Sequence, residues 1–394
     1  MNFFQHSHYQ INKRLLYYLG QWPLQTPKER LFFRSLTAIL IGSIVLPKVI
    51  KMVEYWGNFN NMINCCAVLG LHVVSIIKFI ISTLNARKAK ELAIRIEKNW
   101  ETQGSDIKES IMREYAVRGR YITVIYAIML FSALGLYLGL PLVPFLMDAI
   151  KPLNQSRQLI YLYETEYFVD QDEYYFIILI HYYMTMPFSV GMIVGYDTMF
   201  GVYVQHACGI FSILSSQLER IGVSHHDNRE IQRNSDKRRD DAYEKIVACI
   251  KIHQSVLEFI RLLESMTCVC FFFSIGLCMI MITMTGFMVV THLDEPDIAF
   301  RFGAFALGEV VHMFFLCWQG QLLIDHSEQI FFKVYNVSWY NISLRAKKLL
   351  ILIMMQSSVP CTMTAGKMFV MSLQNFALAL KTSMSYFTVL LSMQ

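Results

Sequence analysis

Seven long apolar segments constrain the fold of this chain more than any other feature of its sequence. A helix needs about 20 residues to cross the hydrocarbon core of a bilayer, and each segment is long enough. The segments lie at about 31–53, 62–84, 121–147, 174–218, 266–290, 302–324 and 367–394. Hydrophobic residues make up 55% of the chain and charged residues 16%, which excludes an ordinary soluble multidomain protein. We therefore expect an all-α membrane protein with seven transmembrane helices.

Several segments depart from a simple span. The fourth apolar pattern continues past Gly209 and is far longer than a bilayer is thick, so this helix should project into water. The fifth helix could begin as early as Tyr243. Near the end of the first segment, Lys48 and Lys51 have side chains long enough to reach the membrane interface. A shorter apolar run at 349–355 predicts a helix lying beneath the membrane.

Lysine and arginine are distributed unevenly between the connections. The N-terminal segment and the connections 85–120, 221–247 and 325–350 together hold 23 of them, whereas the opposite set holds three to five. Because cytoplasmic loops carry the excess of basic residues, the N-terminus is expected in the cytoplasm. Seven spans then place the C-terminus outside, which is the reverse of a G-protein-coupled receptor. The sequon at Asn154 falls in an outer loop, where glycosylation takes place.

The last segment has two different faces. At about 100° per residue one side carries small polar groups and the other carries large apolar ones. The first side holds Asn375, Leu378, Thr382, Ser385, Val389 and Met393, and the second holds Phe376, Leu380, Phe387 and Leu391. This pattern fits the wall of a water-filled pore, and it also fits a helix that packs its polar face within its own bundle. Lys381, near the middle, would tune cation flow in a pore or pair with a neighbouring helix.

No constellation of residues indicates catalysis. The histidines in the spans are scattered and form no i, i+4 pair, which argues against zinc, and we expect no metal and no cofactor. The nine cysteines include no CxxC pair and are interpreted as small core residues. The net charge of +5 arises in particular loops, so we expect no nucleic acid partner. Two acidic residues inside spans, Asp197 and Glu309, are expected to form structural hydrogen bonds or ion pairs.

The outer halves of the second, third, fourth and sixth segments are rich in aromatic and sulfur-containing side chains. A mostly apolar cavity with a few polar groups suits a small, neutral, apolar ligand, although ordinary helix packing gives the same composition. The candidate ligand-binding residues are Leu69, His72, Val73, Leu134, Tyr137, Leu138, His181, Tyr182, Thr185, Met186, Phe302 and Phe305.

The last third of the chain carries a specific series of motifs. They are Leu316-Cys317-Trp318-Gln319-Gly320, Trp339-Tyr340, Arg345-Ala346-Lys347-Lys348-Leu349-Leu350, Thr364-Ala365-Gly366, Lys381-Thr382-Ser383 and Ser385-Tyr386-Phe387-Thr388-Val389-Leu390-Leu391. In order and spacing, this series resembles the insect odorant receptor family over about residues 315–394. Elsewhere the resemblance rests on topology and length.

The resemblance implies inverted seven-helix subunits, four around a central pore, that form odour-gated non-selective cation channels. It implies a multi-pass protein of the plasma membrane in olfactory neuron dendrites, in contact with membrane lipids. It also implies two partners, a shared co-receptor subunit and a small, neutral, volatile ligand. The connection 221–247 is shorter than the co-receptor's, so the chain resembles a ligand-specific subunit. By motif position, the family's apolar gate maps onto Val389 and Met393.

Four regions follow. Residues 1–30 form a cytoplasmic segment, 31–324 hold six helices and the odorant pocket, 325–366 form a cytoplasmic anchor, and 367–394 form the pore-lining helix. Three alternatives remain open. They are a related gustatory-receptor-like channel, which favours a more polar pocket; a transporter, which favours inverted repeats; and a membrane enzyme.

Overall fold

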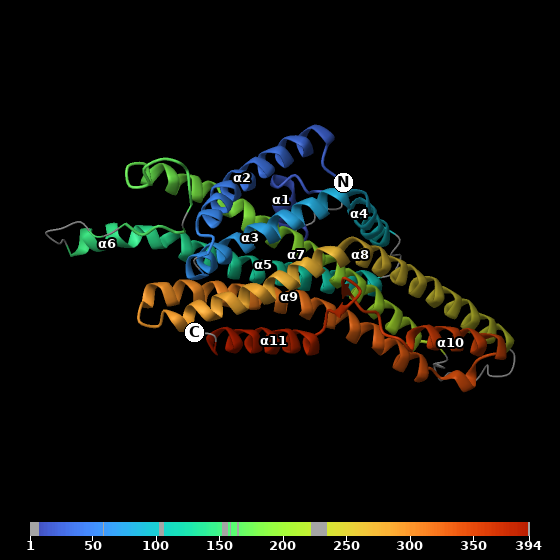
Figure 1. The fold of residues 1–394 in the computed structure, drawn as a ribbon. Coiled ribbons are helices and arrows are strands. Elements are labelled where there is room, and N and C mark those ends of the chain that lie inside the picture. Colours follow the sequence, from blue (N-terminus) through green and yellow to red (C-terminus); the bar gives the residue numbers. More distant parts are fainter. Residues whose placement is uncertain are drawn as a thin grey trace.

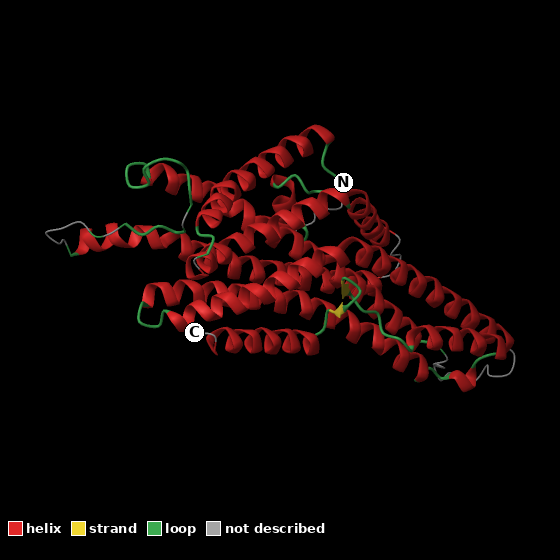
Figure 2. Cartoon of the chain, viewed as in Figure 1, coloured by secondary structure: helices red, strands yellow, loops and turns green. Residues whose placement is uncertain are grey.

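The computed structural model describes residues 8–57, 59–101, 106–151, 157, 159–163, 165–221 and 235–392. The described chain is almost entirely helical (Figures 1 and 2). Its first half contains α1 (Gln10–Tyr18), α2 (Pro27–Glu54), α3 (Phe59–Leu84), α4 (Ala86–Glu101), α5 (Asp106–Gly139), the 3-10 turn η2 (Leu140–Leu142) and α6 (Val143–Ile150). The second half contains α7 (Tyr175–Glu219), α8 (Ser235–Thr291), α9 (Pro296–Tyr335), η3 (Trp339–Asn341), α10 (Leu344–Ser357), β1 (Thr364–Ala365), β2 (Phe369–Val370) and α11 (Leu373–Ser392).

Six helices in the described residues are long and apolar enough to cross a membrane. They include the first six expected segments, in α2, α3, α5 with α6, α7, α8 and α9. The seventh segment is also helical, as the 20-residue α11, but it lies outside this set. Polar residues such as Gln374, Asn375 and Lys381 lower its mean hydropathy. An all-helical chain with at least six helices long and apolar enough to span a membrane is thus confirmed.

Three helices extend beyond the apolar segments that predicted them. Helix α5 begins at Asp106, α8 begins at Ser235 and α9 continues to Tyr335. A helix can continue through charged sequence as long as one of its faces stays apolar. Hydropathy alone therefore makes these helices shorter than they are. The expected boundaries at residues 30/31 and 324/325 therefore fall inside α2 and α9. The helix expected beneath the membrane is α10, which packs against α8 and α9.

Helix α7 forms the centre of the bundle. Every residue from 189 to 211 is buried, and the helix contacts α1, α2, α3, α5, α8 and α9. Glycines let neighbouring side chains approach its backbone closely. A Cβ atom at Gly195 would lie 3.3 Å from Leu16 Cδ2, and one at Gly209 would lie 3.0 Å from Met112 Sδ. The apolar pattern of this 45-residue helix lacks a polar face because neighbours surround it.

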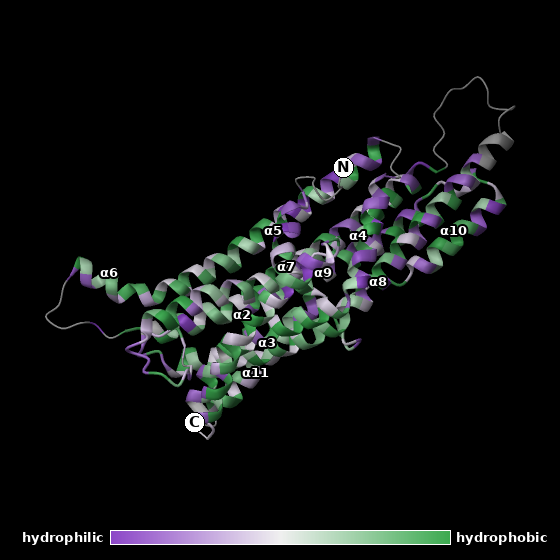
Figure 3. Cartoon of the chain, turned by 90° about the horizontal axis from the view of Figure 1, so that it is seen from above, coloured by the Kyte–Doolittle hydropathy of each residue, from purple (hydrophilic) through white to green (hydrophobic). Residues whose placement is uncertain are grey.

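The connections separate to opposite ends of the bundle. Helices α4 and α10 lie at one end, and α6 and the C-terminus lie at the other (Figure 1). The view turned by 90° shows the same separation, with hydrophilic colouring over α4 and parts of α10 (Figure 3). The basic connections 85–120 and 325–350 therefore share one end, which is the grouping that the count of lysine and arginine assumed.

A short hairpin attaches α11 to the bundle. Strands β1 and β2 pair antiparallel, and Gly366 at their turn has φ of +64° and donates its N–H to the Cys268 carbonyl at 2.9 Å. The chain then passes α9 so closely that a Cβ at Gly320 would lie 2.1 Å from the Met371 carbonyl oxygen. The glycine of the motif at 316–320 is therefore required by backbone approach.

Replacing Gly320 with alanine should destabilise the protein by about 1–3 kcal/mol, because the added methyl group overlaps a backbone atom. Gly276→Ala is the matched control, since a Cβ there meets nothing within 4 Å. Alanine at that helical position should be neutral or stabilising. Thermal unfolding in detergent measures both variants, and equal melting temperatures would contradict the close approach.

Candidate ligand-binding site

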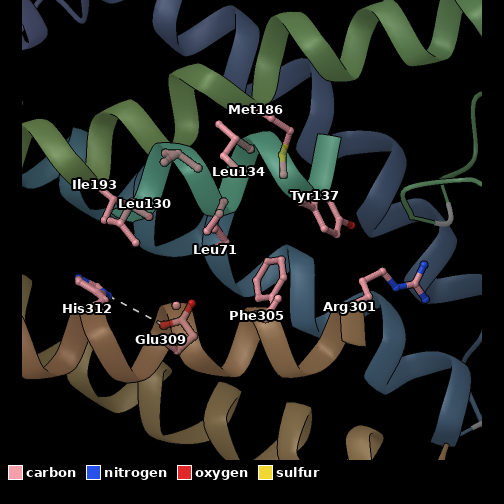
Figure 4. A pocket seen from close by; sticks show the side chains of 14 residues that line it. Leu71, Leu130, Leu134, Tyr137, Met186, Ile193, Arg301, Phe305, Glu309 and His312 are labelled. Carbon is pink, nitrogen blue, oxygen red and sulfur yellow. Dashed lines mark ion pairs between the residues drawn. The ribbon is translucent and has the colours of Figure 1, made fainter. Parts of the chain in front are cut away.

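A cavity of about 90 Å³ lies between α3, α5, α7 and α9. This volume is several times what a single water molecule needs. Its described lining consists of Leu71, Leu130, Ala133, Leu134, Tyr137, Met186, Val190, Ile193, Arg301, Ala304, Phe305, Gly308, Glu309 and His312 (Figure 4). The walls are apolar, while Arg301 lies at one end and Glu309 and His312 at the other. Such a site holds a small apolar molecule and orients one polar group on it.

A second cavity of about 210 Å³ adjoins the first. Its described lining consists of Asn64, Cys65, Val68, Tyr137, Tyr161, Leu162, Tyr163, Gln171, Arg301, Phe302 and Phe305. Tyr137, Arg301 and Phe305 line both cavities, so they form the wall between them. The Tyr137 hydroxyl donates to the Leu162 carbonyl at 2.5 Å, and its ring meets Phe305 edge to face with centroids 5.9 Å apart. The wall is therefore tied to the connection before α7.

That connection is held in place by hydrogen bonds of its own. The Tyr161 hydroxyl donates to Asp172 at 2.5 Å, and the Gln171 amide donates to the Thr165 carbonyl at 2.6 Å. Desolvation, followed by the contact with Asp172, raises the pKa of Tyr161 above its ordinary value, so its hydroxyl stays a donor at neutral pH. Four residues of this connection line the second cavity, which the connection closes on one side.

Four helices meet at one buried carboxylate beyond the end of the first cavity. Asp197 on α7 accepts from Lys78 on α3 and from the Tyr126 hydroxyl on α5 at 3.0 Å. His312 on α9 places Nε2 3.1 Å from the second carboxylate oxygen and 2.9 Å from the Lys78 ammonium. The expectation that Asp197 forms a structural ion pair is thereby met. Glu309 also has close polar neighbours, Cys278 and His312.

A second buried cation lies between α2, α3 and α7. Lys48 places its ammonium 2.8 Å from His72 Nε2 and 3.4 Å from the ring centroid of Tyr163. His72 Nδ1 lies 2.8 Å from the Ser189 hydroxyl. The prediction that Lys48 reaches the membrane interface is wrong, because hydrogen bonding and a cation–π contact hold it inside. Lys51 is half-buried and pairs with Glu54 and Glu166.

Five of the twelve predicted ligand residues line the cavities: Leu134, Tyr137, Met186, Phe302 and Phe305. The structure places the other seven in the helix packing around them. His72 contacts Lys48, and His181 lies 2.9 Å from Ser43 Oγ. Tyr182 shares a hydrogen bond with Thr165 at 2.5 Å, and Thr185 donates to the His181 carbonyl. The remaining three, Leu69, Val73 and Leu138, are buried or half-buried.

The predicted pore residues lie on α11. Lys381, Ser385 and Val389 are exposed and Thr382 is half-buried. Met393 and the sequon residue Asn154 lie outside the described residues.

Helical spacing could have identified most of the lining residues that were missed. Arg301, Glu309 and His312 follow from Phe305 at steps of four, four and seven along one face of α9. Leu130 precedes Leu134 by four positions in the same way. The polar loop residues of the second cavity carry no comparable signal, because long-range contacts place them.

Zinc donors need not lie as a pair on a single helix. The structure brings together donors from two helices, Cys278 of α8 with Glu309 and His312 of α9, with all donor atoms within 4.8 Å of one another. Among the described residues, this buried group has donors that suit a metal ion.

Replacing Lys78 with methionine should destabilise the protein by about 3–5 kcal/mol, because it leaves the Asp197 carboxylate buried without its ammonium. Adding Asp197→Leu should recover most of that loss. The control Lys333→Met breaks a partly exposed pair with Glu219 and should cost less than about 1 kcal/mol. Unfolding in detergent measures the series, and a Lys78→Met variant as stable as the control would contradict this account.

Comparisons with known proteins agree with this architecture. A family model described as 7tm Odorant receptor matches residues 58–384. Odorant receptor 13a of Drosophila melanogaster is 23% identical over 407 residues, covering 95% of this chain and 92% of the relative. Odorant receptor 10 of Aedes albopictus is 25% identical over 172 residues, covering 43% and 42%.

A solved structure shares the fold. The olfactory receptor OR5 of the insect Machilis hrabei, in complex with eugenol, aligns with a TM-score of 0.80 at 15% identity, covering 98% of this chain and 97% of that one. The sequence match extends over most of the chain and the structural match over nearly all of it. This chain belongs to the insect odorant receptor family.

Proposed function

We propose that this chain is the ligand-binding subunit of an odorant-gated, non-selective cation channel. It assembles with co-receptor subunits, four chains around one pore, in the plasma membrane of olfactory neuron dendrites. Its N-terminus is cytoplasmic, α11 is the seventh span and its C-terminus is outside. One observation carries the proposal. Helix α9 lines an apolar cavity and also packs against α11, whose polar face is not covered by the rest of the chain. Catalytic activity is not expected.

The packing of α11 supports a role facing other subunits or water. Its large apolar side packs inward: Phe376 meets Phe314 with ring centroids 5.5 Å apart, and Phe387 lies against Gly286. The Ser383 hydroxyl donates to the Met279 carbonyl at 3.3 Å. On the opposite side, Ser385 is exposed and Val389 is 55% exposed. This arrangement favours a pore wall over packing of the polar face within the same bundle.

Helix α9 connects the cavity to α11. One of its faces presents Phe305 and Glu309 to the cavity, and further along it Gln321 accepts from the Leu373 backbone N–H at 3.2 Å. A ligand that binds more tightly when α9 and α11 are displaced outward shifts the channel toward its open state. Withdrawing Val389 from the pore axis would wet an apolar constriction and let cations pass.

The ligand is a small, neutral, volatile molecule. The cavity walls bury apolar surface, and the polar residues at either end orient a hydroxyl, carbonyl or similar group. The outer surface of the bundle suits membrane lipids, because α2 alone exposes Leu31, Phe32, Ile39 and Leu46. Odour binding and channel opening thus occupy different sides of α9.

Filling the cavity should weaken the odorant response. Gly308 lines the cavity, and a Cβ there meets nothing within 4 Å, so Gly308→Leu occupies ligand space. We expect the half-maximal odorant concentration to rise about tenfold or more. Gly135→Leu on exposed α5 is the control and should respond normally. Currents from cells expressing the chain with a co-receptor, against an odorant panel, measure this, and surface labelling confirms expression. An unchanged dose response would refute this cavity.

Replacing Val389 with serine should raise the current without odorant, because a polar side chain lowers the cost of wetting the constriction. Met384→Ser is the control, since Met384 is similarly exposed but lies on the other side of α11. Basal current and relative permeability to sodium and calcium are compared in both variants. If Val389→Ser alters neither quantity, α11 does not form the gate.

A further inference from the structure

Three side chains of different chemistry face one another at the end of the ligand cavity. Cys278 Sγ lies 3.1 Å from Glu309 Oε2 and 3.3 Å from His312 Nδ1, and those two atoms lie 3.9 Å apart. A point equidistant from the corners of this triangle is ~2.0 Å from each, close to zinc–donor distances of about 2.0–2.3 Å. Only shifts of a few tenths of an ångström separate the donors from zinc geometry.

A carboxylate is already placed behind the histidine. Metal-binding histidines donate their second N–H to such a group, which fixes the ring and its tautomer. Here Asp197 lies 3.1 Å from His312 Nε2, on the side of the ring away from Cys278 and Glu309. The Lys78 ammonium also approaches Nε2, at 2.9 Å. With a metal on Nδ1, Nε2 carries the proton and donates to Asp197 Oδ2, so Lys78 donates to Asp197 Oδ1 alone and must move away from Nε2.

The charges of the cluster balance when a divalent cation is present. The Cys278 thiolate and the carboxylates of Glu309 and Asp197 contribute three negative charges, and Lys78 with the metal contributes three positive ones. Uncompensated charge is costly at a site where all these side chains are buried. Without the metal, the Cys278 thiol donates to Glu309, and among the described residues Glu309 has no salt-bridge partner other than His312. Metal binding therefore releases the thiol proton.

We propose that Cys278, Glu309 and His312 bind one Zn²⁺ at the end of the odorant cavity. Three protein donors leave a fourth position, and Glu309 and His312 both line the cavity (Figure 4). That position accepts a ligand with a free electron pair, of which thiols and amines bind zinc best. The inference deepens the proposed function by naming a ligand class, but it rests on the cluster and not on channel gating.

Cobalt substitution tests the site without any current measurement. The full-length chain, with its co-receptor if needed, is purified in detergent, stripped with a chelator and titrated with Co²⁺. We expect one equivalent to produce a thiolate-to-cobalt band and the visible bands of a four-coordinate ion. Cys278→Ser should abolish the thiolate band, and Asp197→Asn should weaken metal affinity about 10- to 100-fold. Cys270→Ser, a buried cysteine on the same helix, is the control and should behave like the natural chain.

Stability and ligand exchange complete the test. Zn²⁺ should raise the melting temperature of the natural chain and of Cys270→Ser, but not that of Cys278→Ser, whose metal-free melt shows whether it has folded. A short alkanethiol should shift the visible cobalt bands of the natural chain. Absence of a thiolate band, or its persistence in folded Cys278→Ser, would overturn the metal site. Cobalt bands that an alkanethiol and a short alkylamine both leave unchanged would overturn the open position, whatever the odorant currents show.

Discussion

The rest of the structure depends on the contacts that the buried Asp197 carboxylate makes with three neighbouring helices. It lies at the centre of α7, and it accepts from Lys78 of α3 and Tyr126 of α5 while facing His312 of α9. In a medium without water, each of these groups needs the others, so four helices are fixed in rotation as well as in position. Apolar packing against α7 also stabilises the bundle. Contacts between side chains such as leucine and valine allow a helix to rotate about its axis, whereas hydrogen bonds do not.

The position of the cavity between α3, α5, α7 and α9 is set by Asp197 and its partners. Its four walls come from the same helices that Asp197 connects, and His312 belongs to both. The cavity is therefore apolar along its length and polar where it meets the core. At the other end, Tyr137 and Phe305 divide it from the larger space beneath the connection before α7. The larger space is lined by tyrosine side chains and Arg301, and the smaller cavity is lined mostly by hydrocarbon.

Hydropathy and helical periodicity predicted most of the fold, because both depend on local sequence. The length of α7 and the different faces of α11 were evident in this way. The residues that line the cavities were harder to predict than the helices. Tyr137 and Phe305 were found, whereas His72 and His181 have their ring nitrogens engaged by Lys48 and Ser43. Such pairings join residues more than 20 positions apart, and no local pattern records them. The charge partners of Asp197 were unpredictable for the same reason.

Helix α8 has a consequence that follows from its length. Its 57 residues extend about 85 Å at 1.5 Å per residue. One portion supports the hairpin and α10, and Thr283 further along donates to the Ser383 carbonyl of α11 at 3.2 Å. A rigid rod of that length converts a tilt of about 2° into ~3 Å of travel at its far tip. Leverage of this kind would couple the end of α8 that supports α10 to the end that contacts α11, with little change in internal packing.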